Sequence, residues 1–74
     1  MAKYNGYRSW NAWNVSLWIN NDEGLYNEAV RLVREKGHEK AARSMAADLT
    51  GGRTPDGARY TLTSIKEAIR GIDS

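Results

Sequence analysis

The sequence predicts a small all-α protein. Apolar residues recur at helical spacing in four segments, and glycines or turn-forming residues separate these segments. Only one segment also alternates like a strand, and no second strand of matching quality is there to pair with it. We therefore expect residues 1–74 to form a single domain of three to four short helices, with a helix-turn-helix-like C-terminal half.

The first expected helix spans residues 9–20, with Ser9 as its N-terminal cap. Its apolar side chains form two stripes on nearly opposite sides, one of Trp10, Trp13 and Leu17 and the other of Ala12, Val15 and Ile19. Residues 13–20 also alternate with strand periodicity, and helix is the favoured interpretation. Apolar stripes on two sides predict packing between partners. We expect either a homodimer or an exposed patch with at least one tryptophan.

The second expected helix, residues 24–36, has the clearest amphipathic pattern. Asn20 and Glu23 are spaced as a cap and its reciprocal acid. Gly37 is a natural C-terminal stop. The apolar face contains Leu25, Tyr26, Ala29, Val30, Leu32 and Val33, and we expect Leu25, Ala29, Leu32 and Val33 to be buried.

The third expected helix, residues 39–49, has a face of small residues that permits close helix packing, formed by Ala41, Ala42, Met45, Ala46 and Leu49. Gly51 and Gly52 end it. A turn follows at residues 55–57, where Pro-Asp-Gly favours chain reversal. The last helix is expected to start near Thr63, with Ser64 and Glu67 at capping-box spacing. Its apolar face consists of Leu62, Ile65, Ala68, Ile69 and Ile72.

Composition argues for a protein that works by binding. There is no cysteine, and His38 is the only histidine, so we expect no metal site, no cofactor and no enzyme activity. No apolar run approaches the ~20 residues that span a bilayer, so we expect a cytoplasmic protein without membrane association. The net charge of +2 is too small to indicate nucleic-acid binding by itself.

Residues 45–72 resemble a segment in the DNA-binding region of large serine recombinases. There a helix leads through Gly, Thr-Pro, Gly, a basic residue, an aromatic residue and Thr into a second helix. The matching positions are Ala46, Leu49, Gly52, Thr54, Pro55, Gly57, Arg59, Tyr60, Thr61, Ser64, Ile65 and Ile69. This resemblance implies DNA binding only, because no recombinase catalytic domain fits in the chain.

If the last helix enters a major groove, its first turns face the bases. The candidate nucleic-acid-binding residues are then Arg59, Thr61, Thr63, Ser64, Lys66 and Arg70, with Arg59 reaching a phosphate. The alternative is that these residues form only a cap, a turn and a solvated helix face.

The N-terminal part has a different resemblance. Residues 4–7 read Tyr-Asn-Gly-Tyr, residues 9–15 read Ser-Trp-Asn-Ala-Trp-Asn-Val, and residues 17–23 read Leu-Trp-Ile-Asn-Asn-Asp-Glu. This pattern is similar to a family of small uncharacterised proteins of tailed bacteriophages and plasmids. The resemblance implies a phage or mobile-element origin, and many such accessory proteins inhibit host machinery.

Three functional hypotheses follow. In the first, an accessory protein of a phage or mobile element binds DNA through its C-terminal helix pair. In the second, the protein inhibits a host enzyme or an anti-phage defence system such as CRISPR, with Trp10, Trp13 and Trp18 at the protein interface. In the third, an oligomer sequesters a small ligand in a pocket lined by arginine and tryptophan.

Overall fold

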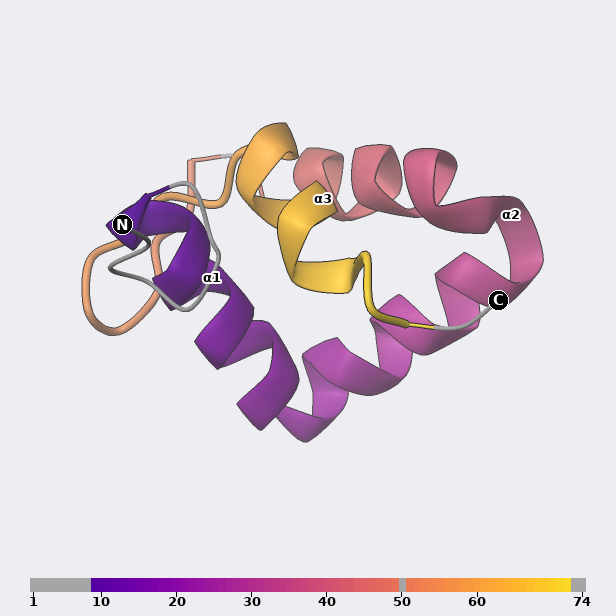
Figure 1. The fold of residues 1–74 in the computed structure, drawn as a ribbon, viewed down its shortest axis with the longest axis horizontal. Coiled ribbons are helices and arrows are strands. Elements are labelled where there is room, and N and C mark those ends of the chain that lie inside the picture. Colours follow the sequence, from indigo (N-terminus) through magenta and orange to yellow (C-terminus); the bar gives the residue numbers. More distant parts are fainter. Residues whose placement is uncertain (1–8, 50, 73–74) are drawn as a thin grey trace.

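The computed structural model describes residues 9–49 and 51–72, and these residues form three helices without a named strand. The helices are α1 (Trp10–Asn21), α2 (Glu23–Leu49) and α3 (Leu62–Ile69). The expected all-α class is confirmed. Figure 1 shows α3 lying between α1 and the second half of α2. The predicted N-terminal motif at residues 4–7 lies outside the described residues.

Helix α1 confirms the helical interpretation of the first segment. Its cap is Ser9, whose hydroxyl accepts a hydrogen bond of 3.1 Å from the Ala12 amide. One predicted stripe is buried and consists of Ala12, Val15 and Ile19. In the other stripe Trp10 is exposed, while Trp13 and Leu17 are half-buried. The described residues therefore cover only one of the two stripes.

The start of α2 differs from the prediction that Asn20 is its cap. Helix α1 continues through Asn21, and the Asp22 carboxylate accepts a hydrogen bond of 3.0 Å from the Leu25 amide. Asp22 is therefore the cap. The Asn20 side chain instead donates to the Ser16 carbonyl, one turn back in α1. Asn20 cannot cap α2 because it is still part of α1, which continues past its last apolar residue, Ile19, to Asn21.

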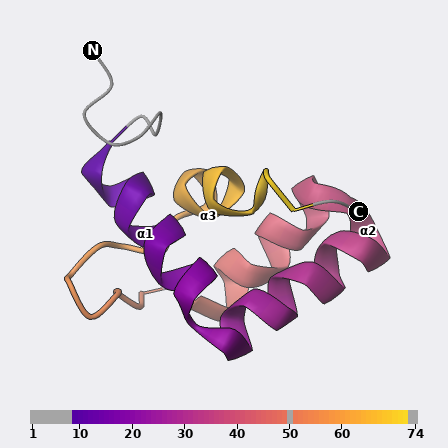
Figure 2. The same cartoon turned by 60° about the horizontal axis from the view of Figure 1, so that its bottom comes forward.

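Gly37 breaks α2 into two arms, as its predicted role as a helix stop requires. Its φ of 84° lies in the left-handed region, which favours glycine. The arms diverge from this kink (Figures 1 and 2). Within them Ala29, Leu32, Val33, Ala41, Ala42 and Met45 are buried, whereas Leu25 is only half-buried. Together with residues of α1 and α3 they form the core.

Residues 51–61 form the connection between α2 and α3. The predicted turn is confirmed by a hydrogen bond of 2.8 Å from the Gly57 amide to the Thr54 carbonyl. On either side of this turn, Arg53 and Arg59 pair as an isolated antiparallel bridge. The C-terminal half is therefore helix, turn and helix in order. Its connection is longer than the three- or four-residue turn of the DNA-binding motif.

The cap of α3 lies one turn earlier than predicted. Thr61 caps the helix, and Ser64 is its reciprocal partner at the third helical position. The Ser64 amide donates to the Thr61 hydroxyl, and the Thr61 amide donates to the Ser64 hydroxyl. The predicted pairing of Ser64 with Glu67 is therefore wrong. Thr61 is the last residue with extended backbone before the helix begins at Leu62. This is the position from which a side chain caps a helix.

Candidate functional site

The connection is attached to α1 by polar side chains. Asn11 makes two hydrogen bonds with the backbone of Arg59, donating to its carbonyl at 2.8 Å and accepting from its amide at 2.7 Å. The Asn11 side chain thus pairs with both the N–H and the C=O of one residue, as the backbone of a neighbouring strand would. Arg59 is thereby fixed beside the first turn of α1.

Asn14 attaches the turn itself. Its side chain is buried at 1 % exposure. It accepts a hydrogen bond of 2.6 Å from the Thr54 hydroxyl and donates one of 2.9 Å to the Asp56 carboxylate. The Thr54 hydroxyl in turn accepts from the Ala58 amide at 3.0 Å. These bonds satisfy a buried amide that would otherwise be costly to desolvate.

Trp18 completes this attachment. Its indole N–H donates to the same Asp56 oxygen that Asn14 reaches, at 2.9 Å. The hydrogen bonds from Asn14 and then Trp18 lower the pKa of Asp56, because they favour the charged carboxylate. We call Asn11, Asn14 and Trp18 the α1 clamp.

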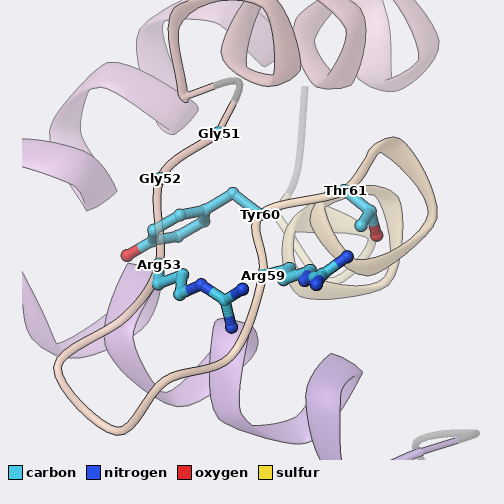
Figure 3. Close-up of a pocket in the computed structure, with 6 residues that line it drawn as sticks. All are labelled: Gly51, Gly52, Arg53, Arg59, Tyr60 and Thr61. Carbon is cyan, nitrogen blue, oxygen red and sulfur yellow. The ribbon is translucent and has the colours of Figure 1, made fainter.

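The clamped connection presents two arginines side by side. Hydrogen bonds from the Thr54 amide to the Ala58 carbonyl and from the Tyr60 amide to the Gly52 carbonyl flank the bridge. Arg53 and Arg59 are therefore a non-hydrogen-bonded pair, the type in which facing side chains approach most closely. Both are exposed. Figure 3 shows Arg53 reaching toward Arg59, whose side chain runs toward Thr61.

A pocket of about 280 Å³ lies at this pair, lined by Gly51, Gly52, Arg53, Arg59, Tyr60 and Thr61. Within residues 9–49 and 51–72, no carboxylate forms an ion pair with either arginine. The Arg53 guanidinium donates only to the Gly57 carbonyl, at 3.3 Å. Sequence reasoning missed Arg53. The sequence feature that could have indicated Arg53 is its position opposite Arg59 across the predicted Pro-Asp-Gly turn.

Tyr60 forms one wall of the pocket. Its ring is half-buried against the core and lies across the chain at Gly52 (Figure 3). Burial, together with the nearby Asp22 carboxylate, raises the pKa of the Tyr60 phenol. A Cβ added at Gly52 would meet the Leu49 carbonyl at 3.1 Å and the ring at 3.7 Å. Glycine at this position therefore fits the close approach of the Leu49 carbonyl, whereas the ring lies at an ordinary contact distance.

The other residues predicted to bind nucleic acid are less available. Ser64 is buried at 2 % exposure and is engaged in the cap, so its predicted contact with DNA is corrected. Thr61 is exposed, but its hydroxyl also serves the cap. Thr63, Lys66 and Arg70 line one exposed face of α3 with Glu67.

Two of these cations have acidic neighbours. The Lys66 ammonium lies 3.0 Å from a Glu39 oxygen, and an Arg70 nitrogen lies 3.8 Å from a Glu67 oxygen. Hydrogen bonds from Lys66 and Arg43 lower the pKa of Glu39. The positive charge of this α3 face is therefore partly balanced, unlike that of the arginine pair.

The three tryptophans have different environments. Trp10 is 40 % exposed. Trp13 and Leu17 line a shallow hollow of about 220 Å³ on the outer side of α1. Trp18 is half-buried, and its polar tip is used by the clamp. Trp10 therefore offers more accessible surface to a protein partner than Trp13 or Trp18.

The single histidine, His38, pairs through Nε2 with the Ile72 carbonyl. In the described part of the chain, no three His, Asp or Glu side chains cluster so as to hold a metal ion. None of the helices there is both long and apolar enough to cross a membrane.

Comparison with known proteins identifies a family without indicating an activity. A family model described as a family of unknown function, DUF7249, matches residues 1–73. No curated protein and no solved structure matches the chain. Because the match covers nearly the whole sequence, the chain belongs to the DUF7249 family.

Proposed function

We propose that this protein is a DNA-binding accessory protein of a phage or other mobile element, with the arginine pair as its main phosphate contact. The observation that carries this proposal is the placement of Arg53 directly opposite Arg59. Like charges at facing positions of a ladder are destabilising. A phosphate between the two guanidinium groups removes that repulsion and accepts hydrogen bonds from both.

The α1 clamp supports this interpretation. Asn11 and Asn14 hold the connection, and with it the two facing arginine positions, in place through long-range hydrogen bonds. Binding residues are often carried by a loop that a packed scaffold holds in position, and two exposed cations on such a loop suit a ligand of opposite charge. The turn itself uses one hydrogen bond from Arg53, to the Gly57 carbonyl, and no side-chain hydrogen bond of Arg59 within the described residues.

The α3 face contributes less in this proposal. Lys66 and Arg70 must exchange a protein carboxylate for a phosphate, and the net gain of such an exchange is small. We therefore rank Arg53 and Arg59 first, Lys66 and Thr63 next, and Arg70 last. The phage or mobile-element origin rests on the N-terminal resemblance alone.

Binding of a fluorescent random-sequence duplex, measured by anisotropy over a range of salt concentrations, tests the proposal. Arg53→Ala and Arg59→Ala should each weaken binding to all sequences and reduce the salt slope by about one unit. Each should change thermal stability little, because both side chains are exposed. Arg34→Ala is the matched control, since Arg34 is an exposed arginine on α2. Absence of binding to both duplex and single-stranded DNA in low salt, or an equal effect of Arg34→Ala, contradicts the proposal.

A second candidate function is inhibition of a host enzyme or defence system by protein binding. The observation that favours it is the uncovered stripe of α1, with Trp10 exposed beside the hollow at Trp13 and Leu17. If the protein restores phage plating on a host with active CRISPR defence, Trp10→Ser should abolish that effect. Tyr26→Ser, which changes an aromatic 39 % exposed on α2, should not. Retained activity of Trp10→Ser counts against this candidate.

A further inference from the structure

The pocket at the arginine pair is larger than a phosphate contact requires. Two guanidinium groups suffice to grip one phosphate. The hollow beside them measures about 280 Å³, many times the ~30 Å³ that one water molecule occupies in the liquid. Space therefore remains next to the cationic pair for a further part of the ligand.

The wall of that space is aromatic. Tyr60 lines the pocket next to Arg59, and its ring lies across the chain at Gly52 (Figure 3). Aromatic rings beside cationic side chains are the usual means of binding single-stranded nucleic acid, because each base can stack while the cations follow the backbone. In a duplex the bases are stacked inside the helix and are not free to enter such a pocket.

A second exposed ring belongs to the helix that holds the connection. Asn11 hydrogen-bonds the backbone of Arg59, so the start of α1 lies against this part of the connection. Its neighbour in the sequence, Trp10, is 40 % exposed. Figure 2 likewise shows the connection beside α1. For a strand that continues along the start of α1, Trp10 is a further ring available for stacking.

We infer that the pocket accommodates one unpaired nucleotide, with its phosphate on Arg53 and Arg59 and its base against the Tyr60 ring. This inference rests on the proposed function, because it specifies the ligand of the same site. It changes the expected partner from duplex DNA to a single strand, or to duplex with unpaired bases. The mode differs from a recognition helix in a groove, for which Ser64 is too buried.

The test compares three labelled probes of equal length with the intact protein: oligothymidylate, an abasic strand and a duplex. Thymidylate should bind more tightly than the abasic strand by roughly 5- to 150-fold, the factor that corresponds to one base–aromatic stack. Tyr60→Leu should remove this difference, and Tyr60→Phe should keep it. Tyr26→Leu is the matched control and should also keep it.

A second measurement covers the case in which Tyr60→Leu fails to fold. An oligonucleotide with 5-iodouracil is crosslinked by light to the wild-type protein, and the attached residue is mapped. Attachment at Tyr60 supports the inference. Attachment only at residues outside the pocket overturns it, whatever the variant does.

The outcomes separate this inference from the proposed function. If none of the three probes binds in low salt, the proposed function fails, and the inference fails with it. If the abasic strand binds as tightly as thymidylate, or the duplex binds more tightly than both, the pocket contacts phosphate only. The inference is then wrong, while the proposed function stands.

Discussion

The chain changes direction at Gly37 and again along residues 51–61, and these two places are held by different means. At Gly37 the helix α2 bends within one residue, and the cause is local, namely a glycine with φ of 84°. Residues 51–61 instead form a long connection whose position depends on Asn11, Asn14 and Trp18, which lie 38 to 48 residues earlier in the chain. The first is a hinge between packed arms, and the second is a loop made rigid by a distant helix.

This difference bears on where function is expected. A kink with buried alanines on both sides organises the core and leaves few side chains free for a ligand. A surface connection is free to carry charge, and here α1 holds it in one conformation. Binding residues are often found on loops positioned by a rigid scaffold. The candidate site therefore lies in the connection and away from the kink.

The largest expected effect tests the core around the kink. Leu32, in the first arm of α2, is 4 % exposed. Leu32→Ala should lower the free energy of unfolding by about 2–5 kcal/mol, since it removes buried apolar surface and leaves a cavity. Urea unfolding followed by circular dichroism measures it. Arg34→Ala, an exposed change on the same arm, should have little effect. An unchanged midpoint for Leu32→Ala would refute the core assignment.

The next effect tests the clamp. Asn14→Leu keeps the branched shape and the number of side-chain heavy atoms but loses the hydrogen bonds with Thr54 and Asp56. The loss of one neutral and one charged hydrogen bond should cost about 2–4 kcal/mol. It should also weaken nucleic-acid binding, because the arginine pair is no longer held. Asn27→Leu, at an exposed position of α2, is the control. If Asn14→Leu retains wild-type stability, the connection does not depend on α1.

The contrast also explains what the sequence could predict. The three helices, the cap at Ser9, the stop at Gly37 and the turn at residues 55–57 follow from patterns within a few residues, and all were predictable. The α1 clamp was not, because nothing local in Asn11 or Asn14 indicates a partner so far along the chain. In the candidate site, Arg59 was predicted from the resemblance to serine recombinases. Arg53 was not, because its position opposite Arg59 depends on the register of the two chain segments that flank the turn.

Ser64 shows the limit of spacing as a guide. A serine three residues before a glutamate fits a capping box, but Thr61 has the same spacing to Ser64, whose hydroxyl takes the part of the glutamate. The choice is decided by where the extended backbone of the connection ends. That end point depends on the bridge between Arg53 and Arg59, which the helix pattern does not encode.

A smaller effect compares the glycines of the two direction changes. Gly37 and Gly57 have φ of 84° and 98°, and an added Cβ would meet no atom within 4 Å at either position. Alanine at each should therefore cost roughly 1–2 kcal/mol through backbone strain alone. Gly71→Ala is the control, because it too has open space and no left-handed φ. Only Gly57→Ala should also weaken nucleic-acid binding. Equal binding loss for Gly37→Ala would mean that the hinge, and not the connection alone, shapes the site.

The smallest effect concerns pH and tests whether the charge of Asp56 holds the connection. Hydrogen bonds from Asn14 and Trp18 lower the pKa of Asp56 below that of a free aspartate, which is about 4. A group whose pKa is lower in the folded state stabilises the fold above its unfolded pKa, and this contribution is lost as the pH falls through the folded value. Wild-type protein should therefore lose stability on acidification below about pH 4.

Asp56→Asn isolates that contribution. The difference in unfolding free energy between wild type and Asp56→Asn should be constant near neutral pH and should shrink below about pH 4, because the wild-type carboxyl is then protonated. The size of the difference is small, since Asp56 is exposed to solvent. Asp48→Asn removes an exposed carboxylate of α2 that makes no hydrogen bond among the described residues, so its difference from wild type should not follow this curve. If both variants show the same pH dependence, the acid effect reflects net charge, and the Asp56 carboxylate is not what holds the connection to α1.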